Sequence, residues 1–175
     1  HAMGDRVDLI LDGGATTGGL ESTVIDLTVS PPRILRWGLV TAEEVEEVLG
    51  QTLTRAAIVA KADSVLISPG MLSRHYAPSS PLIVAPDDGR ALVDRFLGLG
   101  FHVWWMLFET GDLEVLLGSR FKKMPSDVRA YSSQLYAELH RMDAAGVDRI
   151  VVAAVDAGPK WEAVRDRLMR ASTPE

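Results

Sequence analysis

The sequence contains no cysteine among its 175 residues. Disulfide bonds, thiolate nucleophiles and cysteine-ligated zinc sites are therefore excluded, whereas metal sites built from carboxylates and histidines are not. The sequence also lacks any run close to the roughly 20 apolar residues that a membrane-spanning helix needs, and it does not open with a basic stretch followed by an apolar core. We therefore expect a cytoplasmic protein.

Positive charge is scarce as well. The 18 Lys and Arg residues are outnumbered by 24 Asp and Glu residues, so that the formal net charge is -6. Proteins bind nucleic acids chiefly through clustered Lys and Arg side chains. We therefore expect no direct contact between this segment and RNA. Hydrophobic residues make up 47% of the sequence and charged residues 24%, proportions typical of a soluble chain with a sizeable core.

The first part of the chain is predicted to be the end of a larger domain. We interpret residues 1–4, His-Ala-Met-Gly, as a cloning scar and leave them out of the fold argument. Residues 5–50 contain one predicted helix and three β-prone runs. The runs cover residues 7–11, 22–27 and 33–36. These few elements are too little for an independent core.

The predicted helix of this first part has a clear beginning. Thr41 and Glu44 have the spacing of a capping box, in which the two side chains satisfy backbone groups at a helix start. Val45, Val48 and Leu49 follow at helical spacing, and we expect them to be buried.

The remainder of the chain divides into a linker and an α/β domain. Residues 51–80 show no sustained period and contain several prolines, which indicates a long interdomain linker. From residue 81 onward, strands alternate with helices. Strands are expected at 81–85, 101–108, 113–117 and 148–155; helices are expected at 88–99, from a cap at Ser126 to Gly146, and around Trp161, Val164 and Leu168. This alternation predicts that residues 81–175 form a Rossmann-like α/β domain with an open, mostly parallel sheet.

Candidate binding residues surround a glycine-rich loop at 12–19. The loop lacks the Gly-Lys-Ser/Thr ending of a P-loop, so by itself it is a permissive connection between strands. Ser22 and Thr23 place two hydroxyls beside it, and adjacent strands can bring Arg36 close to them. From these residues alone, the two hydroxyls can equally satisfy backbone groups, and Arg36 can equally form a surface ion pair.

Several motifs together resemble those of one known family. The motifs are Asp8-Leu-Ile-Leu-Asp-Gly-Gly14, Glu21-Ser-Thr-Val-Ile-Asp26, Ile34-Leu-Arg-Trp-Gly38, Ser68-Pro-Gly-Met71, Arg74-His-Tyr-Ala-Pro78 and Asp166-Arg-Leu168. The first three resemble the closing motifs of a YrdC-type domain. The others resemble the linker and second domain of the two-domain form of YrdC-type threonylcarbamoyl-AMP synthases. The resemblance thus covers almost the whole chain and identifies it as the C-terminal portion of such an enzyme.

The resemblance implies a nucleotidyltransferase activity for the parent protein. Such an L-threonylcarbamoyladenylate synthase makes threonylcarbamoyl-AMP and pyrophosphate from threonine, bicarbonate and ATP, for threonylcarbamoyl modification of adenosine in tRNA. ATP is expected as a substrate, and Mg²⁺ is expected in the parent enzyme, although no magnesium site can be identified in this sequence. The expected partners are the substrates, with no membrane and no direct tRNA binding by this segment.

The resemblance also implies roles for five residues. Ser22 and Thr23 are expected to contact bound threonine and nucleotide, since neutral hydroxyls can bond a carboxylate or a phosphate. Arg36 is expected to face the triphosphate, because a guanidinium is suited to phosphate oxygens. Tyr76 is expected to approach the phosphates or the adenylate. His75 is expected chiefly to anchor the linker. The alternative is that both His75 and Tyr76 only anchor it.

The family's N-terminal half carries the Lys and Arg residues that hold the substrates, and no such segment precedes residue 7. We therefore expect this chain to be inactive alone and to contribute no catalytic residue. The alternative is a non-catalytic α/β module that binds a partner or a small ligand at its strand ends. The strands of residues 5–50 would lack their neighbours, and a homodimer through these exposed strands is one expected consequence.

Other polar and aromatic residues are predicted to have structural roles. The expected packing residues are His102, Trp104, Trp105, His140 and Trp161. Carboxylates at predicted element ends are expected to cap helices or face water rather than to bind magnesium; they are Asp87, Asp88, Asp112 and Asp148.

Overall fold

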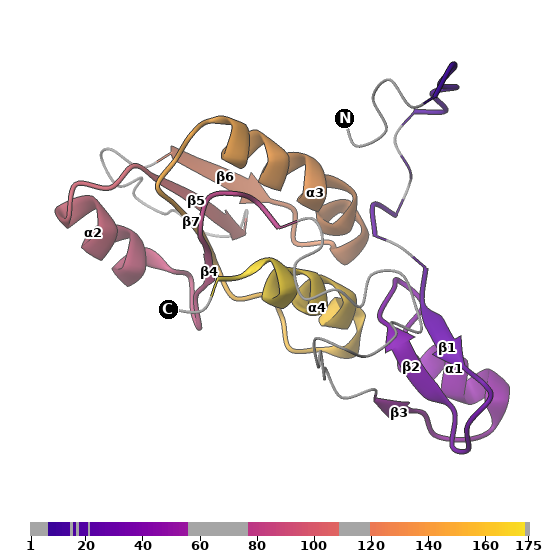
Figure 1. Ribbon diagram of the computed structural model, residues 1–175. Coiled ribbons are helices and arrows are strands. Elements are labelled where there is room, and N and C mark those ends of the chain that lie inside the picture. The colour runs from indigo at the N-terminus through magenta and orange to yellow at the C-terminus, as the bar shows by residue number, and fades with distance from the viewer. Residues whose placement is uncertain are drawn as a thin grey trace, which may run out of the picture.

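The computed structural model describes residues 7–14, 16, 18–20, 22–55, 77–108 and 120–173. They form a small mixed sheet with one helix, followed by a larger α/β unit (Figure 1). In the small sheet, β1 (Val24–Asp26) pairs antiparallel with β2 (Arg33–Arg36), and β2 pairs parallel with β3 (Thr54–Arg55). Helix α1 (Ala42–Leu49) lies between β2 and β3 in the chain.

The larger unit is built on a four-stranded sheet in which every pairing is parallel. Its strand order is β4-β7-β5-β6. The strands are β4 (Leu82–Val84), β5 (Val103–Phe108), β6 (Arg120–Met124) and β7 (Arg149–Val152). The helices are α2 (Arg90–Gly98), α3 (Val128–Ala144) and α4 (Glu162–Ala171), the last preceded by the 3-10 turn η2 (Pro159–Trp161). The predicted Rossmann-like α/β fold is confirmed.

Two cores cover the two faces of this sheet because neighbouring strand residues point to opposite sides. Trp104 and Met106 face α3 and α4, where they pack with Leu135 and Leu168. Trp105 faces the other side, in a cluster that includes Val93 and Phe96 of α2. The centre of the sheet is thus buried on both faces, which explains why β4, β5 and β7 are nearly continuous apolar runs, whereas the edge strand β6 is rich in Lys and Arg. The predicted packing roles of Trp104, Trp105 and Trp161 are confirmed.

Several local expectations for the first part need correction. Residues 7–11 form no strand, because no described strand pairs with them to complete a ladder. The capping box of Thr41 and Glu44 is confirmed. The expected burial of the apolar residues of α1 is wrong: Val48 is 85% exposed, and Val45 and Leu49 are only half-buried. Strand β3 was not expected within the linker, where the polar pair Thr54–Arg55 gives no apolar signal.

Corrections in the second part concern its polar positions. Asp127, rather than Ser126, caps α3, with its carboxylate accepting from the backbone N–H of Ala130 at 2.9 Å. Strand β6 was not expected from the sequence, and the strand that was expected at 113–117 lies outside the described residues. His102 and His140 are exposed rather than packed, because both lie at solvent-facing positions of otherwise apolar segments.

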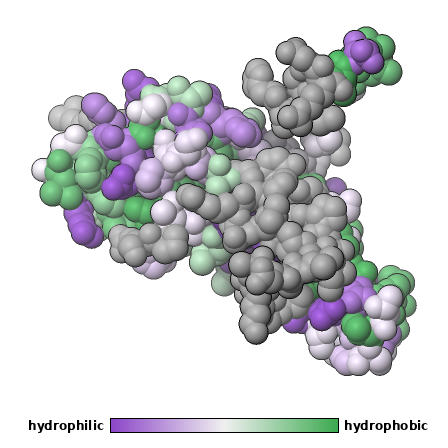
Figure 2. Space-filling model, in the orientation of Figure 1, coloured by the Kyte–Doolittle hydropathy of each residue, from purple (hydrophilic) through white to green (hydrophobic). Residues whose placement is uncertain are grey.

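No described helix is long and apolar enough to cross a membrane. Apolar side chains are nevertheless exposed near the N-terminus, where Leu9, Ile10 and Leu11 are 76%, 71% and 88% exposed. Figure 2 shows hydrophobic colour on this projecting segment, which Figure 1 draws in indigo.

Candidate functional site

Strand pairing brings the predicted binding residues together. In the β1–β2 register, Val24 stands opposite Arg36, so Arg36 lies beside the residues that lead into β1. The Arg36 Nε donates a hydrogen bond of 3.0 Å to the backbone oxygen of Ser22. Ser22 is exposed and Arg36 is half-buried. Ser22, Thr23 and Arg36 therefore form one wall, which we call the hydroxyl–arginine wall.

The hydroxyl of Thr23 already has a partner within the protein. It donates a hydrogen bond of 2.7 Å to the backbone oxygen of Val40. A hydroxyl has one donor and two acceptor positions. In this arrangement the Thr23 oxygen can accept from a ligand N–H, whereas donation to a phosphate or carboxylate would require the hydroxyl to leave Val40.

The linker residues expected at the site, His75 and Tyr76, lie outside the described residues. Their predicted roles stay predictions. The hydroxyl–arginine wall is accordingly the part of the predicted site whose geometry is described.

The glycine-rich loop docks on the α/β unit, which the sequence pattern did not indicate. Gly19 has φ +69°, and a Cβ built on it would lie 2.2 Å from the backbone oxygen of Ser132 and 2.4 Å from the Cα of Ser133, both in α3. Leu20 packs against the core cluster that contains Leu135 and Leu139. Only glycine permits such a close backbone approach. The two residues thus anchor the chain to α3 just before it reaches Ser22.

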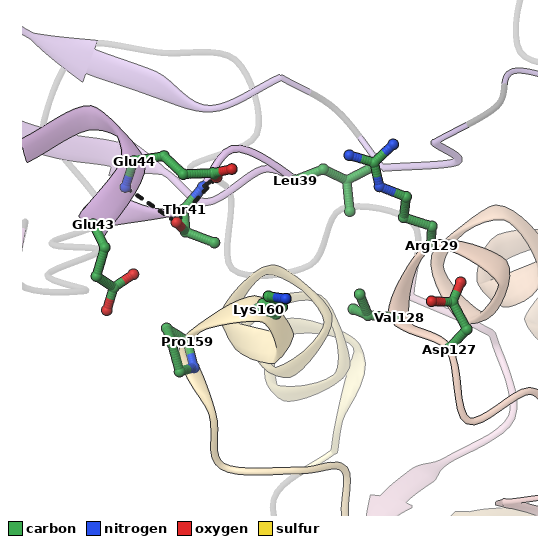
Figure 3. A pocket seen from close by; sticks show the side chains of 9 residues that line it. All are labelled: Leu39, Thr41, Glu43, Glu44, Asp127, Val128, Arg129, Pro159 and Lys160. Atoms are coloured by element: carbon green, nitrogen blue, oxygen red, sulfur yellow. Dashed lines mark hydrogen bonds between the residues drawn. The ribbon is translucent and has the colours of Figure 1, made fainter. Parts of the chain in front are cut away.

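A cavity of about 410 Å³ lies between the first part and the α/β unit. It is lined by residues from the start of α1, the start of α3 and η2, as Figure 3 shows. The last two segments follow the carboxyl ends of β6 and β7. Ligands bind at this edge in many open α/β sheets. Its charged lining residues have both signs: Glu43, Glu44, Asp127, Arg129 and Lys160.

Glu44, one of the acidic residues at this cavity, has a pKa below its ordinary value. Hydrogen bonds from the backbone and then the side chain of Thr41 lower the pKa of Glu44, and the charges of Arg129 and Lys160 add to this effect. Glu44 accepts from the backbone N–H of Thr41 at 2.7 Å as part of the capping box. The carboxylate therefore serves the helix start and neutralises part of the positive charge at the cavity.

Within the described residues, no three His, Asp or Glu side chains are grouped so as to hold a metal ion. Asp87 and Asp88 instead accept hydrogen bonds from the backbone N–H groups of Gly89 and Arg90, at the start of α2. The N-cap of α2 is Gly89, which has no side-chain cap hydrogen bond, so these two carboxylates hold the turn before the helix rather than cap it as expected.

The fold and the wall define a class of protein: a Rossmann-like α/β domain joined to the end of a YrdC-like domain. Comparison with family models agrees with both parts. Residues 40–173 match the model described as "Threonylcarbamoyl-AMP synthase, C-terminal domain", and residues 1–38 match the Sua5, YciO and YrdC model described as "Telomere recombination". The chain belongs to the threonylcarbamoyl-AMP synthase family, of which it contains the C-terminal domain.

Relatives from archaea, fungi and bacteria support this assignment. The chain is 34% identical over 174 residues to the threonylcarbamoyl-AMP synthase of Pyrococcus abyssi, with 95% of this chain and 50% of the relative covered. It is 28% identical to that of Schizosaccharomyces pombe, covering 96% of this chain and 46% of the relative, and 29% identical to that of Bacillus subtilis, covering 98% and 51%. The chain thus spans about half the length of these curated relatives.

Solved structures of similar proteins show the same fold. The crystal structure of P. abyssi Sua5 complexed with L-threonine matches with a TM-score of 0.82 and 34% identity, covering 97% of this chain and 51% of that one. A variant of P. abyssi Sua5 in which a His and the Tyr after it are replaced by Ala matches with a TM-score of 0.76, covering 92% and 47%.

Proposed function

We propose that this chain is the C-terminal portion of an enzyme that makes L-threonylcarbamoyladenylate from threonine, bicarbonate and ATP, for the modification of adenosine in tRNA. The observation that carries the proposal is the hydroxyl–arginine wall, in which the Arg36 Nε lies 3.0 Å from the backbone oxygen of Ser22. This wall occurs in a chain that belongs to the threonylcarbamoyl-AMP synthase family. The structure of P. abyssi Sua5 with L-threonine supports the substrate class. A cytoplasmic location and ATP as substrate belong to the same proposal.

The proposed chemistry needs protein groups that position the substrates and neutralise phosphate charge, rather than groups that form bonds with the substrates. The amine of threonine attacks the carbon of bicarbonate, water leaves, and a carbamate results. A carbamate oxygen then attacks the α-phosphorus of ATP as the bond to pyrophosphate breaks. Arg36 would neutralise charge on the phosphates, because a guanidinium binds phosphate oxygens through two parallel N–H groups. Magnesium would accompany ATP in the complete enzyme.

The hydroxyls of the wall would bind different parts of the ligands. Thr23 would accept a hydrogen bond from the nitrogen of threonine or of its carbamate, because its own proton is donated to Val40. Ser22 would bond a carboxylate or a phosphate oxygen. We extend the proposal to Tyr76 and His75, since P. abyssi Sua5 has been solved with an adjacent His and Tyr replaced, and this chain has such a pair.

Alone, this chain should not turn over. Catalysis by positioning requires the substrate-binding groups to converge, and one wall holds too few of them. The test is pyrophosphate release from ATP with threonine and bicarbonate. The full-length protein should release it and the 175-residue chain should not; full-length protein that makes no threonylcarbamoyl-AMP would refute the proposed function, and comparable turnover by the short chain would refute the account of its inactivity.

The exposed Leu9, Ile10 and Leu11 support a further part of the proposal. Apolar side chains in such a row are usually covered. In the full-length protein the N-terminal half would cover them, whereas in the short chain a second copy would, giving a homodimer. Sedimentation of the short chain, with Leu9 and Leu11 replaced by Ser as the control, measures this association.

The cavity favours a second candidate function, a small-ligand module. It lies at the carboxyl ends of β6 and β7 and is lined by Arg129 and Lys160. The test is thermal stabilisation of the short chain by ATP, threonine or pyrophosphate. Stabilisation that disappears in the Lys160→Gln variant would favour the module. A melting temperature that none of the three ligands raises above that of the chain alone would exclude them as its ligands.

A further inference from the structure

Helix α4 reaches across to the end of β2. The Arg167 Nη2 donates a hydrogen bond of 3.0 Å to the backbone oxygen of Trp37, a residue 130 positions earlier in the chain. Trp37 directly follows Arg36, the last residue of β2. Arg167 is only 7% exposed, and a buried guanidinium bonded to a carbonyl gives a strong and direction-specific contact.

Arg167 is in turn held by its neighbours on α4. Its Nη1 donates to Asp166, whose carboxylate also accepts from Arg170 Nε at 2.9 Å. The side chains of Arg167, Asp166 and Arg170 are only 6%, 7% and 12% exposed. Burying charges costs free energy that is recovered only with good geometry. The cluster fixes the guanidinium at the place from which it reaches Trp37.

A second connection joins Trp37 to α4. The Arg55 guanidinium lies 5.4 Å from the centroid of the Trp37 ring, within the range of a cation–π contact. The Arg55 Nη2 also lies 3.1 Å from Glu162 Oε1, in the first turn of α4. Arg55 is largely exposed, so this connection is the weaker one. Both the backbone and the ring of Trp37 are thus tied to the same helix.

We propose that Arg167 is a positioning residue that sets where Arg36 presents its guanidinium in the hydroxyl–arginine wall. The α/β domain would thereby contribute to the synthase reaction without touching a substrate. The proposal rests on the proposed function, because it assigns Arg36 to the phosphates of ATP. The hydroxyl–arginine wall would then be attached to the α/β unit at two places. Arg167 holds the end at Arg36, whereas Gly19 and Leu20 hold the end before Ser22.

The kinetic test compares Arg167→Gln with Arg170→Gln in the full-length protein. Arg170 shares the buried cluster, where its Nε donates to Asp166, so its variant controls for loss of a buried charge. We expect Arg167→Gln to raise the KM for ATP about tenfold, the factor that one charge-assisted hydrogen bond represents, with a much smaller change in the KM for threonine. General destabilisation would instead lower kcat in both variants, without raising the KM for ATP more than the KM for threonine. An unchanged KM for ATP, or equal changes in both variants, would overturn the proposal.

Hydrogen exchange of the 175-residue chain tests the same proposal without activity. We expect the amides of β2, residues 33–36, to exchange about tenfold faster in Arg167→Gln than in Arg170→Gln, again the factor for one charged hydrogen bond. Equal exchange would show that Arg167 does not hold this strand. If the full-length wild type makes no product, the proposed function fails, and hydrogen exchange alone decides whether Arg167 fixes the end of β2.

Discussion

Replacing Gly19 with alanine tests how firmly the first part of the chain is docked on the α/β unit. A non-glycine residue at φ +69° costs about 1–2 kcal/mol. The added methyl group would also lie 2.2 Å from the oxygen of Ser132, in the backbone of a helix that cannot move aside. We therefore expect the loop to leave α3 rather than adapt to it.

The size of the effect is then set by what docking contributes. Leu20 is half-buried against the α3 core, and burying about half of a leucine side chain stabilises by roughly 1 kcal/mol. The lost burial of Leu20 and the backbone strain of alanine at this φ together set the effect. We expect Gly19→Ala to lower the free energy of unfolding by about 1–2 kcal/mol, equivalent to a fall of about 2–8 °C in Tm.

Two glycine variants provide matched controls for this measurement. A Cβ on Gly13 meets nothing within 4 Å, so Gly13→Ala should leave stability unchanged. Gly50 has φ +65° with nothing within 4 Å, so Gly50→Ala carries the conformational cost without a clash. The assay is urea unfolding followed by tryptophan fluorescence, with hydrogen exchange of α3. If Gly19→Ala matched Gly13→Ala in both measurements, the docking of this loop would contribute nothing.

Three further predictions concern the wall, the linker end and the core. In the full-length protein, Arg36→Ala should weaken ATP-dependent steps, whereas Ser22→Ala and Thr23→Val should weaken threonine or adenylate binding; unchanged steady-state kinetics in all three would remove the site assignment. Burial raises the pKa of Asp143, but hydrogen bonds from Ser79 and Ser80 outweigh it and lower the pKa overall. The carboxylate therefore stabilises the fold above its unfolded pKa of about 3.9 and loses this contribution as the pH falls through its lower folded value. Asp143→Asn should be less stable than wild type at pH 7, and the difference should shrink as the pH falls below about 3.9 in urea unfolding. Leu135→Ala, at a fully buried core position, should lower the free energy of unfolding by about 2–5 kcal/mol, and a loss below 1 kcal/mol would contradict the described core.

Much of the fold followed from local patterns. The apolar, β-branched run that ends in Ile150, Val151 and Val152 predicts a buried strand, and β7 lies in the interior of the sheet. The capping box of Thr41 and Glu44 was predictable because its bonds join residues three apart. Helical spacing in α3 similarly predicted that Tyr131, Leu135 and Leu139 are buried, and burial raises the pKa of Tyr131.

Strand pairing and domain contacts were not accessible in this way. Residues 7–11 have the composition of a strand, but a strand requires a neighbour to complete its hydrogen bonds. The polar β3 and the lysine-rich β6 are strands because β2 and β5 pair with them, while their own composition gives little apolar signal. Exposure of His102 and His140 likewise depends on which side of an element meets solvent.

The sequence by itself determined the family, the alternation of strands and helices, and the residue types of the hydroxyl–arginine wall, because each of these is written in short motifs. Only the tertiary structure decided how that wall is supported. Gly19 meets Ser132 and Arg167 meets Trp37 across more than 100 residues, and no local spacing encodes such contacts. These contacts arise because helices α3 and α4 pack on one face of the sheet. There α3 presents its backbone to Gly19, and α4 presents the Arg167 guanidinium to Trp37.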